Sequence, residues 1–330
     1  GFDVADNEID AAAMAIEAGV NLNCGTVYRH LEAAVKEGKI TEEQIDLNLK
    51  PLLRTRIKLG LLDYKDLSPY AKIKPEVVNC EAHRQLAHEA AVKSVVLLKN
   101  KNNTLPLNLA SMQKIYVTGP TAADNTVLIG NYNGLAGNMV TLVEGIINKV
   151  DVGTVVDYNK GALLAGDNIF HGIYHAASSD AIIASVGNSR MLEGEEGDAM
   201  LSTNGGDRKE IRLPENQIEF IRRLRKQAPD KPLIVVINGG SAIAIPEIAA
   251  LADAILFAWY PGEQGGNAIA DIIFGNENPS GRLPVTFYTS LEDLPPFDNY
   301  SMHNRTYKYF RGKALFPFGH GLSYTDFFYS

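Results

Sequence analysis

Short apolar runs alternate with segments of helix length from about residue 94 onward. The runs are apolar almost throughout, as at 181–186 (AIIASV), where a half-exposed strand would alternate. Strands of this composition are buried on both faces, and intervening helices supply right-handed crossovers. We therefore expect a mostly parallel, doubly wound α/β sheet, an α/β sandwich. The expected strands are 94–99, 115–118, 152–158, 181–186, 232–237, 254–259 and 283–288, and the expected helices are 81–93, 141–150, 169–178, 215–227, 246–251 and 265–274.

The first sixty residues follow another pattern. They contain several helical segments, one opened by Thr41 and Gln44 at capping-box spacing, and one short run typical of a strand. Such a set is too small to enclose a core, so its apolar faces need a partner. That partner is the following domain, a preceding segment or a second copy of the chain, a possible homodimer. The expected helices are 5–18, 27–37 and 41–58, and the expected strand is 20–24.

Composition excludes several classes of function. The chain of 330 residues has a net charge of −8 and no basic block, which argues against binding to nucleic acid or to an anionic membrane surface. No apolar run approaches the ~20 residues that cross a bilayer. Cys24 and Cys80 match neither a metal site nor a disulfide framework. The sequence begins GFDVADN without an initial Met, so we expect a fragment whose compartment the sequence does not reveal.

Four carboxylates crowd the loop that follows the run at 181–186. They are Glu193, Glu195, Glu196 and Asp198. Loops at the carboxyl ends of strands form the ligand sites of open α/β sheets. Crowded carboxylates repel, so one of them can keep a proton and act as a general acid. A solvated charged loop or a calcium-binding loop are the alternatives for an acidic cluster.

Signatures of other enzyme classes are missing. The first parallel strand is followed by TGPTAA at 118–123 instead of G-x-G-x-x-G, which disfavours a dinucleotide-dependent oxidoreductase. Neither a phosphate-binding loop nor a G-x-S-x-G elbow occurs. Trp259 and Tyr260 follow a strand, where they suit core packing or stacking on a sugar ring. Glu263 lies in a Pro-Gly-Glu turn that is more often structural. The chemistry that remains is that of paired carboxylates, as in glycoside hydrolysis.

Six segments, in this order, resemble glycoside hydrolase family three, the family of β-glucosidases and β-xylosidases. They span nearly the whole chain, and the long LEGEE form of the loop is most similar to the β-xylosidase branch. The segments are EAGVNLNCG (17–25), LEGEE (192–196), GGDRKEIRLP (205–214), YPGEQGG (260–266), PSGRLPVT (279–286) and FPFGHGLSYT (316–325).

This resemblance implies an α/β sandwich preceded by the last elements of a (β/α)8-type barrel. Residues 1–60 would be the C-terminal remnant of that barrel, 61–84 a linker, 85–290 the sandwich domain and 291–330 a wrapping tail. The nucleophile of the family is an aspartate in an S-D motif before the segment that matches 17–25. No S-D stands there in this sequence, so we expect the nucleophile to be missing. Asp6 is interpreted as a helix-start residue, with a relic of the nucleophile as the alternative.

The resemblance also assigns roles within the acidic loop. Glu195 is the first choice for the general acid/base and Glu193 the second, with Asp207 and Arg208 as an ion pair that braces the loop. It implies a retaining hydrolase that acts on an oligosaccharide or aryl β-glycoside and needs no metal or cofactor. The missing N-terminal barrel would be the principal partner, the isolated chain would be inactive, and the compartment would be periplasmic or secreted by analogy. A non-catalytic sugar-binding or structural α/β module is the alternative.

Overall fold

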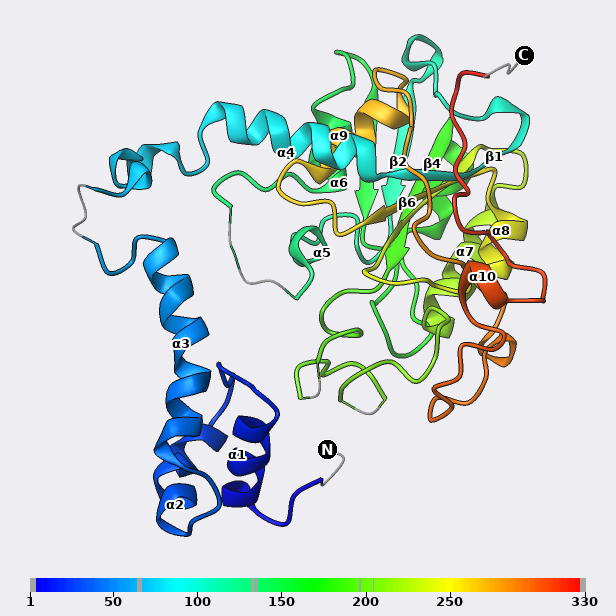
Figure 1. Ribbon diagram of the computed structural model, residues 1–330. Helices are drawn as coiled ribbons and strands as arrows, with labels where there is room; N and C mark the ends of the chain where they lie inside the picture. The colour runs from blue at the N-terminus through cyan, green and yellow to red at the C-terminus, as the bar shows by residue number, and fades with distance from the viewer. Residues whose placement is uncertain are drawn as a thin grey trace, which may run out of the picture. The chain divides into compact units, whose positions relative to one another are not determined.

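The computed structural model describes residues 4–63, 67–131, 134, 136–195, 197–203 and 205–326. The chain forms two compact units, Gly1–Val77 and Val78–Ser330, and each is described here by itself (Figure 1). No helix in the described part of the chain is long and apolar enough to cross a membrane. Glu196 of the acidic cluster lies outside the described residues.

The first unit is helical. Asn7 caps its first helix by accepting hydrogen bonds from the Ile9 and Asp10 amides. The capping box of Thr41 and Gln44 is confirmed at the start of α3. A small core is formed by Ala13, Ile16, Ala34 and Ile40. The elements are α1 (Glu8–Glu17), η1 (Val27–His30), α2 (Leu31–Lys36), α3 (Glu42–Lys58), η3 (Pro69–Lys72) and η4 (Pro75–Val77), where η denotes a 3₁₀ helix.

The strand expected at 20–24 does not form. Val20 and Leu22 are exposed, and the segment has no ladder partner among the described residues. The Tyr28 hydroxyl instead donates a hydrogen bond of 2.5 Å to the Val20 carbonyl. The β-propensity of a five-residue run is weak without a neighbouring strand to pair with.

The second unit is built on a six-stranded sheet in the order β1-β6-β5-β4-β2-β3. Strands β2 to β6 all run parallel to one another. β1 runs antiparallel to its one neighbour, β6, at one edge of the sheet. The expected mostly parallel α/β sandwich is therefore confirmed. The strands are β1 (Val96–Asn100), β2 (Lys114–Thr118), β3 (Val155–Asn159), β4 (Ala181–Gly187), β5 (Leu233–Asn238) and β6 (Ala254–Trp259).

Helices cover both faces of this sheet (Figure 1). Alternate residues of β5 enter two separate cores, one shared with α7 and α8 and the other with α6 and α9. The helix expected at 169–178 is shorter, because Gly172 takes a left-handed conformation and only a 3₁₀ helix follows it. The helices are α4 (Glu81–Ser94), η5 (Lys101–Asn103), η6 (Leu109–Ser111), α5 (Thr126–Ile129), α6 (Leu142–Ile147), η7 (Ile173–Ser178), α7 (Glu215–Gln227), α8 (Pro246–Leu251), α9 (Gly265–Ile273), η8 (Leu291–Asp293) and α10 (Thr306–Tyr309).

The last expected strand, 283–288, is also absent as a strand. Phe287 forms one isolated bridge with Phe316, and Pro284 has no amide hydrogen to continue a ladder. The tail instead reaches β1, where the Leu322 amide donates to the Leu97 carbonyl at 2.8 Å. His320 Nε2 lies 2.8 Å from the carbonyl oxygen of Leu98. These contacts lay the tail along the edge of the sheet.

Candidate active site

The acidic loop starts where two central strands end. The side-chain oxygen of Gln217 accepts the Gly187 amide at 2.7 Å, and its nitrogen donates to the Gly187 carbonyl at 2.9 Å. A Cβ on Gly187 would stand 2.1 Å from the Asn238 carbonyl oxygen, and the residue has a φ of +149°. Only glycine fits this position. The ends of β4 and β5 are thereby held close together beneath the loop.

The loop folds back on itself through backbone hydrogen bonds. The Glu193 amide donates to the Ser189 carbonyl at 3.0 Å, which closes a first turn. The Asp198 amide donates to the Glu195 carbonyl at 2.9 Å, which closes a second. Leu201 joins the two turns by donating to the Met191 carbonyl at 2.8 Å. These hydrogen bonds join the described parts of the loop to one another.

Glu193 is the anchor of the first turn, and its side chain is 10% exposed. One carboxylate oxygen accepts hydrogen bonds from the Tyr260 hydroxyl at 2.5 Å and from the Gly240 amide. The other accepts from the Asn188 amide group at 3.0 Å and the Ser241 hydroxyl at 3.3 Å. These hydrogen bonds hold the Glu193 carboxylate in one position.

Arg208 adds a positive charge to the same carboxylate. Its Nε lies 3.4 Å from Glu193 Oε2. The Nη2 group donates to the Ser241 hydroxyl at 2.5 Å and to the Ala242 carbonyl at 3.2 Å. The ion pair that the structure gives Arg208 is with Glu193, and its hydrogen bonds reach the loop after β5.

The Tyr260 hydroxyl donates to Glu193, a contact that the sequence analysis did not predict. Burial, and next the nearby charge of Glu193, raise the pKa of its phenol far above the usual value. The phenol therefore stays a hydrogen-bond donor. Trp259 packs in the core, with its ring 4.7 Å from that of Phe257 and its Nε1 donating to the Ser94 carbonyl at 3.1 Å.

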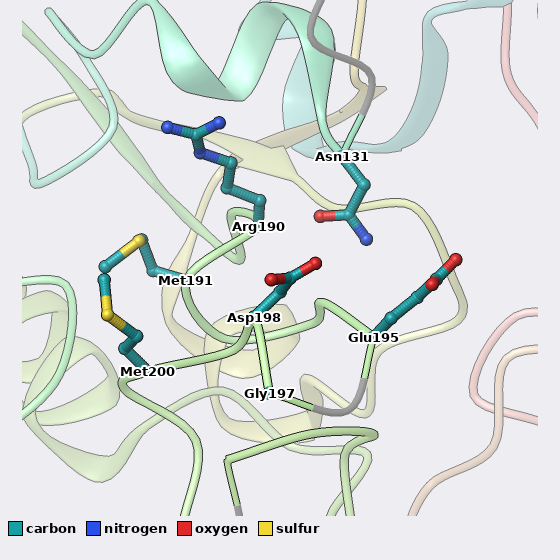
Figure 2. Close-up of a pocket in the computed structure, with 7 residues that line it drawn as sticks. All are labelled: Asn131, Arg190, Met191, Glu195, Gly197, Asp198 and Met200. Atoms are coloured by element: carbon teal, nitrogen blue, oxygen red, sulfur yellow. The ribbon is translucent and has the colours of Figure 1, made fainter.

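Glu195 has the opposite environment. Its side chain is exposed, and its carboxylate accepts no hydrogen bond from the residues that the structure describes. It lines two cavities, one of about 710 Å³ shared with Glu193 and Tyr260 and one of about 360 Å³ (Figure 2). The smaller cavity is lined by Asn131, Arg190, Met191, Glu195, Gly197, Asp198 and Met200.

A family model, described as the Glycosyl hydrolase family 3 C-terminal domain, matches residues 95–324. The chain belongs to glycoside hydrolase family 3. The β-xylosidase/α-L-arabinofuranosidase 2 of Medicago sativa subsp. varia is 34% identical over 96% of this chain and 41% of its own length. The periplasmic β-glucosidase of Salmonella typhimurium is 33% identical over 96% of this chain and 45% of its own length.

A solved family 3 structure has the same fold. The exo-β-xylosidase XlnD, in complex with a xylobiose aziridine activity-based probe, superposes with a TM-score of 0.84 at 31% identity. The match covers 98% of this chain and 42% of XlnD. The chain thus spans less than half the length of each of these three relatives.

The structure also places three further residues of this family 3 chain that the sequence analysis singled out, Asp198, Glu263 and Asp6. Asp198 lines the smaller cavity with Glu195. The Glu263 carbonyl accepts the Val140 amide at 2.8 Å, which joins the loop after β6 to the segment before α6. The residue that starts the first helix is Asn7 rather than Asp6.

No group of three or more His, Cys, Asp or Glu side chains in the described part of this family 3 chain is arranged to hold a metal ion. Sequence reasoning missed the donors to Glu193, notably Gly240 and Tyr260. The signal was available, because each follows a parallel strand at the edge where the acidic loop begins.

Proposed function

We propose that this chain supplies the general acid/base of a retaining, exo-acting β-xylosidase or β-glucosidase, and that Glu195 is that residue. The enzyme would hydrolyse O-glycosyl bonds of plant-type oligosaccharides. One observation carries the assignment: Glu195 is exposed at a cavity wall, whereas Glu193 is enclosed by donors. A general acid must reach the oxygen that it protonates, and Glu195 is free to do so.

The mechanism uses Glu195 twice. In the first step its carboxyl group protonates the leaving oxygen while a second carboxylate attacks the anomeric carbon. In the second step the Glu195 carboxylate takes a proton from water, which displaces the enzyme carboxylate and releases the sugar with retained configuration. Glu193 is unsuited to this work, because every proton transfer through it would break hydrogen bonds that hold the loop.

The second carboxylate is proposed to lie outside these 330 residues. The chain covers 41% of the Medicago relative and 42% of XlnD, which leaves room in such proteins for a further catalytic domain. On this proposal residues 1–60 are the last elements of a (β/α)8-type barrel, 61–84 the linker, 85–290 the sandwich and 291–330 the tail. Retention requires the two carboxyl groups to approach to ~5 Å.

The test is hydrolysis of aryl β-xyloside and β-glucoside by the 330-residue chain and by a longer protein that contains it, each with Glu195→Gln. We expect no turnover by the chain alone and turnover by the longer protein that falls in Glu195→Gln. Turnover by the chain alone that is lost in Glu195→Gln would place the nucleophile within these residues, and Asp6 would be examined first. Sugar binding with no effect of Glu195→Gln on hydrolysis would favour the non-catalytic sugar-binding module.

A further inference from the structure

Two methionines form one wall of the cavity of about 360 Å³. Met191 and Met200 lie on the same side of it with their thioethers turned toward each other (Figure 2). The Met200 side chain is 72% exposed, and the bond from the Leu201 amide to the Met191 carbonyl fixes the two segments together. Met191 is half-buried. Thioethers at a surface are an apolar, adaptable contact.

Polar groups line the rest of the cavity. Glu195 stands on the side opposite the methionines with its carboxylate turned away from them, and the Asp198 carboxylate and the Asn131 amide lie between (Figure 2). The Asn131 side-chain nitrogen donates to the Glu193 carbonyl at 3.2 Å, which ties this group to the anchored turn. A pyranose ring has an apolar C–H face and a rim of hydroxyls. The cavity offers an apolar surface to the first and hydrogen-bonding groups to the second.

We propose that this cavity holds the leaving-group sugar of the substrate and, in the reverse direction, an acceptor sugar, with Met191 and Met200 as the residues that select a sugar over a small alcohol. The inference rests on the role proposed for Glu195. The atom that a general acid protonates belongs to the leaving group, so the leaving group lies against that acid. The cavity of about 710 Å³ fits less well as the sugar site. On its wall, Tyr260 and Arg208 are both engaged in contacts with Glu193.

The transfer step balances without a further reactant. The acceptor hydroxyl oxygen forms a bond to the anomeric carbon as the bond from that carbon to the enzyme carboxylate breaks. The hydroxyl proton passes to the Glu195 carboxylate, and the nucleophile is released as an anion. Methanol can take the same proton path without touching the methionine wall. The ratio of transfer to a sugar over transfer to methanol therefore isolates the contribution of Met191 and Met200.

The experiment uses the longer protein with 4-nitrophenyl β-xyloside as donor, and compares methyl β-xyloside with methanol as acceptors. We expect Met191→Ala/Met200→Ala to lower the sugar-to-methanol ratio about tenfold, the scale on which an apolar pocket loses selectivity when contacts are removed. Met302→Ala is the matched control, because Met302 is 50% exposed in the tail. Its ratio should equal that of the unmodified protein. An unchanged ratio in the double variant overturns the proposal.

Met200→Ala alone carries the same test if the double variant fails to fold, since its side chain is mostly exposed. A second readout separates this inference from the proposed function. With the methyl groups of the six methionines labelled in the 330-residue chain, methyl β-xyloside should shift the signals of Met191 and Met200 but not that of Met302. If hydrolysis proves independent of Glu195, the proposed function fails, and these shifts decide the cavity: their presence sustains a sugar site and their absence overturns it.

Discussion

The two turns of the acidic loop differ in almost every physical respect. The first turn, 189–193, carries a nearly buried carboxylate surrounded by donors from β4, β5 and β6 loop ends. The second turn, 194–200, carries an exposed carboxylate beside a cavity. Glu193 and Glu195, which carry these two carboxylates, are the same type of residue and stand two positions apart. The comparison teaches that hydrogen-bond donors and exposure, rather than acidic character, distinguish the enclosed Glu193 from Glu195, the proposed acid/base.

Replacing Glu195, the proposed acid/base, should have the largest effect on hydrolysis. Glu195→Gln in the longer protein should lower the hydrolysis of oligosaccharides by about 10²–10⁴-fold, because the sugar alcohol leaves poorly without a proton. An aryl glycoside with an acidic phenol should lose less in its first step. The measurement is kcat/KM for both substrates, with thermal unfolding as the control for stability. Equal losses for the two leaving groups would contradict the role of Glu195 as acid.

Removing the anchor should cost stability as well as activity. Glu193→Ala leaves the Arg208 guanidinium and several donors without their acceptor, and we expect unfolding of the second unit to become easier by about 3–5 kcal/mol. Urea titration of the 330-residue chain measures this. Glu195→Ala is the matched comparison and should change stability by less than about 0.5 kcal/mol. The reverse ranking of the two variants would exchange the roles assigned to the turns.

A single donor to the anchor should matter less. Tyr260→Phe removes the hydroxyl that donates to Glu193 at 2.5 Å and keeps the ring. We expect a loss of about 1–3 kcal/mol, the usual scale for a hydrogen bond to a charged group. The same titration checks it. Stability unchanged in Tyr260→Phe would mean that the remaining donors suffice to hold the turn.

The smallest expected effect concerns pH. The pKa of the Tyr260 phenol is raised in the folded chain, by burial and then by Glu193, while the unfolded phenol ionises near pH 10. Its contribution is complete below the unfolded pKa and declines as pH rises above it, because the unfolded chain then binds fewer protons. Stability measured between pH 8 and about 11 should therefore fall more steeply for the natural chain than for Tyr260→Phe. Parallel curves would contradict this assignment.

Local patterns predicted the fold well where pairing partners were guaranteed. The apolar runs that became β4, β5 and β6 lie within a parallel sheet, and their composition already indicates burial on both faces. The segments 20–24 (VNLNC) and 283–288 (LPVTFY) are less apolar, and among the described residues they have no strand beside them to complete a ladder. Strand formation depends on residues far away in the chain, which periodicity does not report.

The candidate site was predicted in part for the same reason. Glu193 and Glu195 were both identified from the acidic pattern, but the sequence offered no reason to separate them beyond alignment. The contacts that distinguish the two glutamates come from Gly240 and Tyr260, which stand 47 and 67 residues after Glu193 in the chain. Which carboxylate faces those donors is set by the turn at Ser189, a geometric fact that residue composition does not carry.

The contact of the tail with β1 has a consequence for how copies of the chain behave toward one another. β1 is antiparallel to β6 on one side, and on its other side the Leu97 carbonyl is taken by the Leu322 amide. An open sheet edge is a template on which another molecule can add a strand and begin to aggregate. The tail at Leu322 thus covers part of the β1 edge and opposes the addition of a strand from a second molecule there.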